Sequence, residues 1–120
     1  MKSIVHIDNS GFFRKLMKTF LEKEGFEVES FDSPHEADMA IGSGSADMVI
    51  MSLTFADIGG LEFLERIKES YGGPVVVVSS SVNKEKAEEL IAKGALAAIN
   101  KSGGSWQEGL KPHLSALKGQ

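Results

Sequence analysis

The sequence predicts an α/β fold. We expect one flavodoxin-like (βα)5 domain over residues 1–120, with a five-stranded parallel sheet in order 2-1-3-4-5 between two layers of helices. Five short apolar or alternating runs are interleaved with patterns typical of amphipathic helices. Two of the runs, 49–51 and 75–78, are continuously apolar, as central strands of parallel sheets are. Polar side chains follow four of the runs, so they would meet at the carboxyl edge of the sheet.

The first strand is expected at 3–7, and the first helix follows Ser10, whose hydroxyl can cap it. Apolar residues recur in this helix at three- and four-residue spacing, and Gly25 ends it. The alternating segment 26–31 is expected to be an edge strand with one covered face. The apolar positions of the first helix are Phe12, Phe13, Leu16, Met17, Phe20 and Leu21.

A second helix is expected from Ser33 to Ile41, with Pro34 in its first turn. The later elements continue the alternation, which is typical of parallel strands joined by right-handed helical crossovers. They are expected at 47–53 (strand), 60–70 (helix), 74–78 (strand), 83–93 (helix), 96–100 (strand) and 105–117 (helix).

Two details of the later helices concern their packing. Ala87, Leu90 and Ile91 are expected to face inward from the fourth helix. Pro112 is expected to kink the last helix or delay its start, because its ring removes a backbone donor.

Composition limits the classes of function. The formal charge of −4 and the absence of a basic cluster argue against a nucleic-acid partner. The absence of cysteine excludes disulfides and thiolate metal sites. No apolar stretch is long enough to span a membrane, and the chain opens on a strand pattern rather than a signal peptide. We therefore expect a cytoplasmic protein with no membrane partner and no cofactor.

The polar residues at the strand ends are Asp8 with Asn9, then Ser52, Ser79 and Lys101. This pattern resembles the receiver domain of two-component response regulators. In that family, an aspartate accepts a phosphoryl group at the position of Ser52. The resemblance implies a signalling domain that is not an enzyme, and the missing acceptor implies a degenerate member, or pseudo-receiver.

The resemblance also implies where a magnesium ion would bind. The family uses two acids after the first strand, the acceptor, and a backbone carbonyl two residues later. Those positions are Asp8, Asn9, Ser52 and Thr54. Because magnesium prefers carboxylate oxygens and only Asp8 is charged, we expect at most weak binding at Asp8.

Lys101 corresponds to the lysine that contacts the phosphoryl group in the family, and we expect it to pair with Asp8. Ser52 is expected to hydrogen-bond Lys101 or a neighbouring backbone group. Ser79 corresponds to a hydroxyl that moves toward the phosphoryl group, although it could equally cap a turn. Ala98 occupies the position of the family's switch aromatic. Together these losses favour a phosphorylation-independent protein-interaction module.

Two alternatives stay open. The chain could be a working phosphorelay receiver with an unusual acceptor, Ser52 or Asp57. It could also sense a small anion or metabolite, because the pocket keeps Lys101 and has lost acids.

The expected contact surface is the face formed by the fourth helix, fifth strand and fifth helix. Its partner would be a signalling protein or a second copy of the chain. Trp106 either covers the sheet edge or is an exposed anchor there, since tryptophan is enriched at binding hot spots. His6 is expected to be a hydrogen-bonded core residue. The candidate surface residues are Trp106, Ala98, Lys86 and Glu89.

Overall fold

The computed structural model describes residues 1–55 and 58–120, and in this part of the chain five parallel strands form one sheet. The strand order is β2-β1-β3-β4-β5, which confirms the predicted topology. The neighbouring strands β1 and β3 pair in parallel, with Ile4 opposite Met48 and Ile7 opposite Met51. The strands are β1 (Ser3–Ile7), β2 (Glu27–Phe31), β3 (Met48–Met51), β4 (Val75–Ser79) and β5 (Ala97–Asn100).

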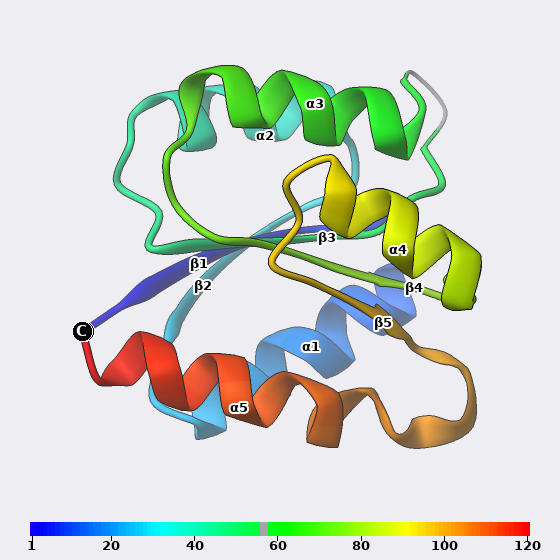
Figure 1. Cartoon of the computed structure of the whole chain (residues 1–120). Coiled ribbons are helices and arrows are strands. Elements are labelled where there is room, and N and C mark those ends of the chain that lie inside the picture. The colour runs from blue at the N-terminus through cyan, green and yellow to red at the C-terminus, as the bar shows by residue number, and fades with distance from the viewer. Residues whose placement is uncertain (56–57) are drawn as a thin grey trace.

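Helices cover both faces of the sheet (Figure 1). α1 and α5 pack against one face, while α2, α3 and α4 lie on the other. None of the described helices is both long and apolar enough to cross a lipid bilayer. The helices are α1 (Gly11–Lys23), α2 (Pro34–Gly42), α3 (Gly60–Ser70), α4 (Lys84–Ala92), a short 3-10 helix η1 (Ser102–Gly104) and α5 (Trp106–Lys118).

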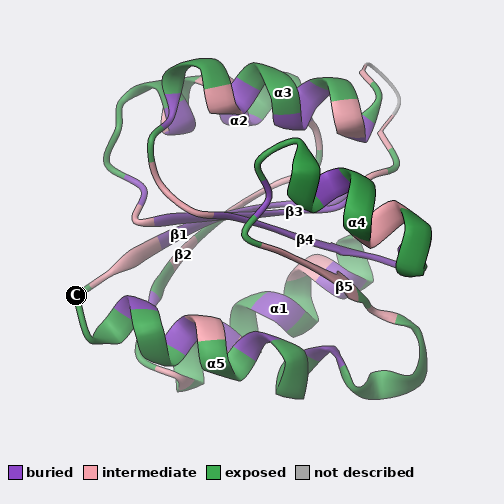
Figure 2. Cartoon of the chain, in the orientation of Figure 1, coloured by how far each residue is buried: buried purple, intermediate pink, exposed green. Residues whose placement is uncertain are grey.

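The core has two parts because successive side chains of a strand point to opposite faces of the sheet. In β1, Ile4 joins the cluster under α1 and α5, while Val5 and Ile7 join the cluster under the other helices. Every residue of β3 and β4 is buried, as Figure 2 shows for these central strands. The continuous apolar runs therefore identified the central strands correctly.

The predicted helix starts and stops are present. The Ser10 hydroxyl accepts a hydrogen bond from the Phe13 amide at 3.2 Å, and the Ser33 hydroxyl accepts one from the Glu36 amide at 3.4 Å. Gly25 follows α1 with a φ of 97°, a left-handed conformation that favours glycine. The Ser10 cap fixes where α1 begins, after the short segment 8–10 that follows β1.

Three apolar side chains expected to face inward are exposed. Phe12, Leu16 and Ile91 keep 76%, 41% and 52% of their surface accessible. Helical spacing marks every apolar position on a broad face, but α1 and α4 each have only a narrow strip against the sheet. The prediction was wrong for these side chains because the neighbouring elements do not extend over them.

The structure also corrects the expectation for Pro112. α5 runs without interruption from Trp106 through Pro112, so its start is not delayed. Pro112 is exposed on the helix. Water can therefore satisfy the carbonyl that loses its helical donor.

Candidate functional site

The carboxyl edge of the sheet brings four predicted residues together. Asp8 follows β1, Ser52 follows β3, Ser79 ends β4 and Lys101 follows β5. Backbone hydrogen bonds continue the sheet beyond the strand ends, with the Ser52 amide 2.9 Å from the Ile7 carbonyl oxygen. The Lys101 amide likewise donates to the Ser79 carbonyl at 3.3 Å. The site is therefore built on the rigid part of the fold.

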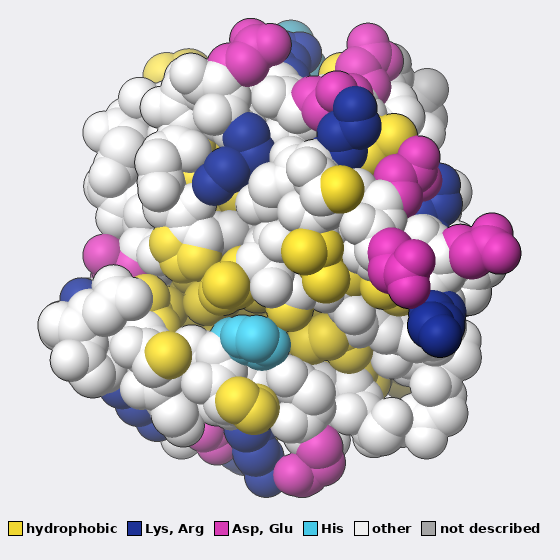
Figure 3. Space-filling model, in the orientation of Figure 1, with side chains coloured by type: hydrophobic (Ala, Val, Ile, Leu, Met, Phe, Trp, Pro, Cys, Tyr) yellow, Lys and Arg dark blue, Asp and Glu magenta, His cyan; other side chains and the backbone are white. Residues whose placement is uncertain are grey.

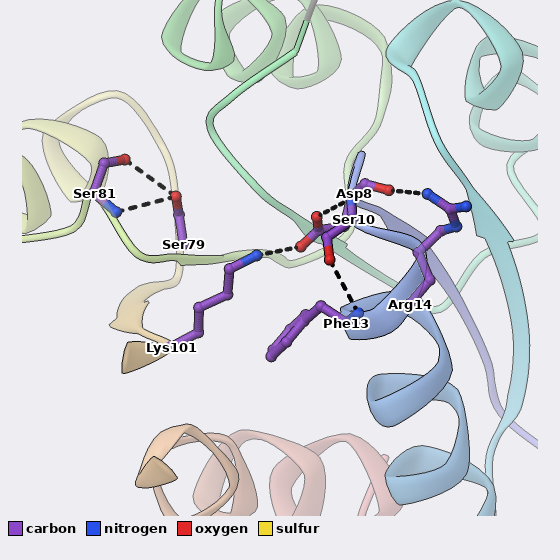
Figure 4. Close-up of polar contacts among 7 residues, drawn as sticks. All are labelled: Asp8, Ser10, Phe13, Arg14, Ser79, Ser81 and Lys101. Atoms are coloured by element: carbon purple, nitrogen blue, oxygen red, sulfur yellow. Dashed lines mark hydrogen bonds and ion pairs between the residues drawn. The ribbon is translucent and has the colours of Figure 1, made fainter. Parts of the chain in front are cut away.

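Asp8 is fully buried and uses both carboxylate oxygens (Figure 4). The Lys101 ammonium lies 2.8 Å from Oδ2, and the Ser10 amide donates to Oδ1 at 2.8 Å. The Arg14 guanidinium donates to the Asp8 backbone carbonyl at 2.7 Å. A buried carboxylate requires such compensation, because losing its hydration is unfavourable. The expected pair between Asp8 and Lys101 is thus present, and the helix cap Ser10 and Arg14 of α1 also donate to Asp8.

Lys101 is held at a second point. Its ammonium lies 4.3 Å from the centre of the Phe13 ring, a distance at which the ring face attracts a cation. Only 17% of the Lys101 side chain is exposed. This lysine is therefore fixed between Asp8 and α1. Its contact with Phe13 was not predicted, because it depends on how α1 is rotated over the strand ends.

Ser52 occupies the edge of the sheet between Asp8 and Ser79 and is 3% exposed. Lys101 is bound to Asp8 and not to Ser52, so the first of the two expected partners of the Ser52 hydroxyl is ruled out, while a neighbouring backbone group stays a prediction. The physical reason is charge: a buried carboxylate attracts the ammonium more strongly than a neutral hydroxyl does.

Ser79 takes part in a turn. Its hydroxyl lies 3.1 Å from the Ser81 hydroxyl and 3.4 Å from the Ser81 amide. Figure 4 shows this hydroxyl directed toward Ser81 while the Lys101 ammonium points to Asp8. Of the two interpretations open from the sequence, the geometry is that of the turn cap.

The remaining metal-site candidates do not add charge next to Asp8. Asn9 and Thr54 are both exposed residues at the ends of β1 and β3. Within 1–55 and 58–120, no three histidine or acidic side chains are grouped closely enough to hold a metal ion. Asp57, the alternative acceptor, lies outside the described residues.

Asn100 is a site residue that sequence reasoning missed. Its side-chain amide donates to the Val82 carbonyl at 2.7 Å and to the Ser80 carbonyl at 3.3 Å. Its amide oxygen accepts from the Ser102 backbone at 2.7 Å. Asn100 thereby ties the loop after β4 to the loop after Lys101. The available signal was a polar residue at the end of an otherwise apolar strand.

His6 lies in β1, two residues before Asp8, so both side chains are on the same side of the sheet. It is fully buried, as expected, but neither ring nitrogen has a hydrogen-bond partner among the described residues. Burial lowers the pKa of His6 to about 4, so the imidazole is neutral near pH 7. The expected hydrogen bond is absent, and the ring lies tilted by 57° against Phe13, with the two ring centres 6.2 Å apart.

The contact face expected over α4, β5 and α5 does not include Trp106, because, of the two interpretations open for this residue, the exposed anchor is ruled out by its burial. Trp106 is 5% exposed and packs edge-on against Phe13 and Phe20, with ring centres 4.9 and 5.3 Å apart. It is a core residue between α1 and α5 and cannot be a surface anchor. Lys86 and Glu89, the candidate surface residues on α4, form an ion pair with each other at 2.9 Å.

Other apolar groups occupy that face. Ile91 on α4 and Leu96 before β5 are about half exposed, at 52% and 50%, and Ala98 is partly exposed. Figure 3 shows a band of hydrophobic side chains across the middle of this face, between α4 and α5. The surface is therefore apolar at its centre and charged along α4.

Comparison with known proteins agrees with this geometry. The family described as the response regulator receiver domain matches residues 4–107. The chain belongs to this family. Receiver domains are signalling modules of two-component systems, and they act through contacts with other signalling proteins.

Two curated relatives show the range of proteins that carry this domain. A protein-glutamate methylesterase/protein-glutamine glutaminase of Rhodospirillum rubrum is 32% identical over 108 residues, which cover 88% of this chain and 29% of that protein. The chemotaxis protein CheY of Halobacterium salinarum is 27% identical over 101 residues, covering 83% of this chain and 84% of that protein. The chain spans about a third of the length of the first curated relatives it matches, between 28% and 34%.

Solved structures support the fold. A CheY-like receiver domain protein from Methanospirillum hungatei superposes with a TM-score of 0.84 at 24% identity, over 99% of this chain and 98% of that one. A two-component response regulator from Clostridium difficile gives 0.88 at 19% identity, over 100% and 98%. At these identities the likeness concerns the fold alone.

Proposed function

We propose that this receiver domain is a pseudo-receiver that signals through protein contacts without being phosphorylated. The observation that carries the proposal is the buried Ser52 at the acceptor position, beside an Asp8 already paired with Lys101. A serine hydroxyl becomes a nucleophile only with a base or a metal to activate it. Here the Asp8 carboxylate beside Ser52 holds the Lys101 ammonium instead, so Asp8 is not free to activate the Ser52 hydroxyl.

The metal site supports the same proposal. Both oxygens of Asp8 have donors in the folded chain, one from Lys101 and one from the Ser10 backbone. Magnesium would have to displace the ammonium and would gain a single carboxylate. We therefore propose at most weak magnesium binding at Asp8 and no resident cofactor. Without the metal, phosphoryl transfer loses its main electrostatic stabilisation.

The remaining parts of the switch support it further. The Ser79 hydroxyl is bound within its own turn, and Ala98 has no ring that could change rotamer. A change at Ser52 would therefore have no aromatic side chain through which to reach the surface of β5.

The proposed contact surface is the face of α4, β5 and α5, now without Trp106. Ile91, Leu96 and Ala98 provide apolar area, with Lys86 and Glu89 at its charged border. An apolar centre with a polar rim is the usual composition of a protein interface. We propose a signalling protein or a second copy of the chain as the partner. No catalytic activity, nucleic acid or membrane is involved, and the location is cytoplasmic.

Family membership favours one competing function, a phosphorelay receiver with Ser52 or Asp57 as acceptor. The anion sensor has less support, because the charge of Lys101 is already neutralised by Asp8.

The test is an amide NMR titration with magnesium and beryllium fluoride, which mimics a phosphoryl group on a carboxylate. We expect the natural chain to show no shift changes around Ser79 and Lys101. The double variant Asn9→Asp/Ser52→Asp, which restores the family's acids, should respond there and serves as the matched control. Shift changes in the natural chain equal to those of the variant would contradict the proposal.

A further inference from the structure

We propose that the outer edge of β2 binds a basic, extended segment of a partner protein, which adds to the sheet as a further strand. β2 is an end strand of the sheet, and within 1–55 and 58–120 only β1 pairs with it. This edge lies at the opposite end of the sheet from β5 and the α4–β5–α5 face. The inference therefore goes beyond the proposed function and does not rest on it.

The backbone of β2 offers hydrogen-bonding groups on its outer side. The Glu27 amide donates to the Lys2 carbonyl at 3.0 Å, which places the backbone groups of Glu27 on the side of β1. Successive residues of a strand turn their N–H and C=O groups to alternate sides, so Glu29 also bonds to β1. The N–H and C=O groups of Val28 and Ser30 consequently point away from the sheet, and no other strand of the described chain pairs with them.

The edge is accessible to a partner. No residue of β2 is buried, whereas every residue of β3 and β4 is (Figure 2). A row of free donors and acceptors on an end strand is what strand addition uses. A partner helix could not satisfy these groups, because a helix bonds its own backbone internally. The backbone geometry therefore indicates an extended partner.

A hollow beside the edge gives room for side chains of the added strand. Its volume is about 380 Å³. Its lining joins Glu27, Val28 and Glu29 of β2 to Ser3 of β1 and Ser45 before β3. Side chains of an added strand would alternate between the two faces of the sheet, so those on one face would lie over this polar hollow.

Charge indicates the chemistry of the partner. Glu27 and Glu29 are exposed, and the exposed Asp32 directly follows β2. None of these three acids takes part in a salt bridge among the described residues. Lysine or arginine at alternate positions of an added strand would lie beside the two glutamates, and opposite charges at such positions stabilise a sheet.

The same charges argue against a second copy of the chain as the partner. Pairing of two β2 edges would bring Glu27 and Glu29 of one copy next to those of the other. Like charges on adjacent strands destabilise a sheet, and charged edge residues are a common protection against self-association. The edge is therefore unfavourable for self-pairing and favourable for a basic segment.

The test uses the full chain and a labelled peptide of about eight residues in which Val and Lys alternate. Two control peptides carry N-methyl groups, one on every Val and the other on every Lys. Only one of these two sets of N–H groups can face β2, so one control should bind like the parent and the other at least about tenfold more weakly. Fluorescence anisotropy measures affinity. Amide hydrogen exchange by NMR should show slower exchange at Val28 and Ser30 when the parent peptide is bound.

Variants of the chain test the same residues. Val28→Pro removes an outward donor but leaves the bonds of Glu27 and Glu29 to β1, and should weaken binding by at least about fivefold. Glu27→Lys/Glu29→Lys should weaken it by at least about tenfold. Glu62→Lys/Glu69→Lys, at exposed residues of α3, changes the net charge equally and is the matched control. Its affinity should stay within about twofold of the natural chain. Because the charge variants alter only exposed side chains, they decide the question even if Val28→Pro does not fold.

Several results would overturn the inference. Absence of binding at millimolar peptide, equal binding of the two N-methylated peptides, or an equal loss from the charge variants on β2 and α3 would each do so. A dimer in sedimentation velocity that disappears in Val28→Pro, without peptide binding, would assign the edge to a second copy of the chain instead.

Discussion

The carboxylate of Asp8 is buried without access to water, and its stability in the fold rests on Lys101. We predict that Lys101→Met lowers the free energy of unfolding by about 2–4 kcal/mol, because it leaves a buried charge without its counter-ion. Adding Asp8→Asn to that variant should restore most of the loss. Urea unfolding followed by the fluorescence of Trp106, the single tryptophan, measures both.

The matched control for this pair is Lys111→Met. Lys111 pairs with Glu108 at 3.0 Å on the exposed side of α5, where an ion pair contributes little. An equal loss from Lys101→Met and Lys111→Met would contradict the role assigned to the buried pair.

His6 makes the stability of the fold depend on pH. Its folded pKa of about 4 lies below the ordinary value of 6.5, so the unfolded chain binds the proton more readily. Stability is therefore complete above pH 6.5 and declines as the pH falls toward 4. Relative to His6→Leu, the natural chain should lose roughly 2–3 kcal/mol between pH 7 and 4.5. Parallel urea curves for the two proteins at both pH values test this; identical pH dependence would contradict it.

At the scale of single residues, the sequence predicted the contacts that follow from strand ends meeting. Asp8 and Lys101 pair because parallel strands bring their carboxyl ends to one edge. The contacts of Lys101 with Phe13 and of Arg14 with the Asp8 carbonyl could not be predicted, since they depend on the rotation of α1. The choice for Ser79 likewise depends on the geometry of its turn.

Among the elements, α3 begins in close contact with the segment that follows β3. A Cβ added at Gly60 would lie 2.5 Å from the Leu53 Cα and 2.6 Å from its carbonyl oxygen. Backbone cannot yield as a flexible side chain does, so Gly60→Ala should destabilise the fold by about 2 kcal/mol or more. Thermal or urea unfolding measures the change.

Gly42→Ala is the control for that substitution. Gly42 is exposed at the end of α2, and a Cβ added there would meet nothing within 4 Å. Its replacement should be neutral or stabilise the fold by about 0.5 kcal/mol. Comparable destabilisation by both variants would show that close approach is not what requires Gly60.

Helices and strands were predictable because hydrophobic period and turn residues agree over most of the chain. Which apolar residues are covered was less predictable. Trp106 is buried because Phe13 and Phe20 of α1 reach it across the helix pair. Phe12 on the same helix is exposed, because none of the described elements extends over its ring. Periodicity gives the faces of a helix but not the extent of its neighbours.

For the molecule as a whole, the strand-end site and the proposed contact surface are separate. The strand ends hold a closed Asp8–Lys101 pair, and the α4–β5–α5 face offers apolar area. A partner bound on that face would leave the site untouched. We therefore expect partner binding to be unaffected by Ser52→Ala.

The most direct test of the central claim is the intact mass of the protein after incubation with a small phosphodonor and magnesium. Ser52→Ala and Asp57→Ala are treated in parallel, and the Asn9→Asp/Ser52→Asp variant shows that the donor is active. We predict no phosphoryl adduct on the natural chain. An adduct that disappears in Ser52→Ala or Asp57→Ala would contradict the pseudo-receiver assignment and identify the acceptor.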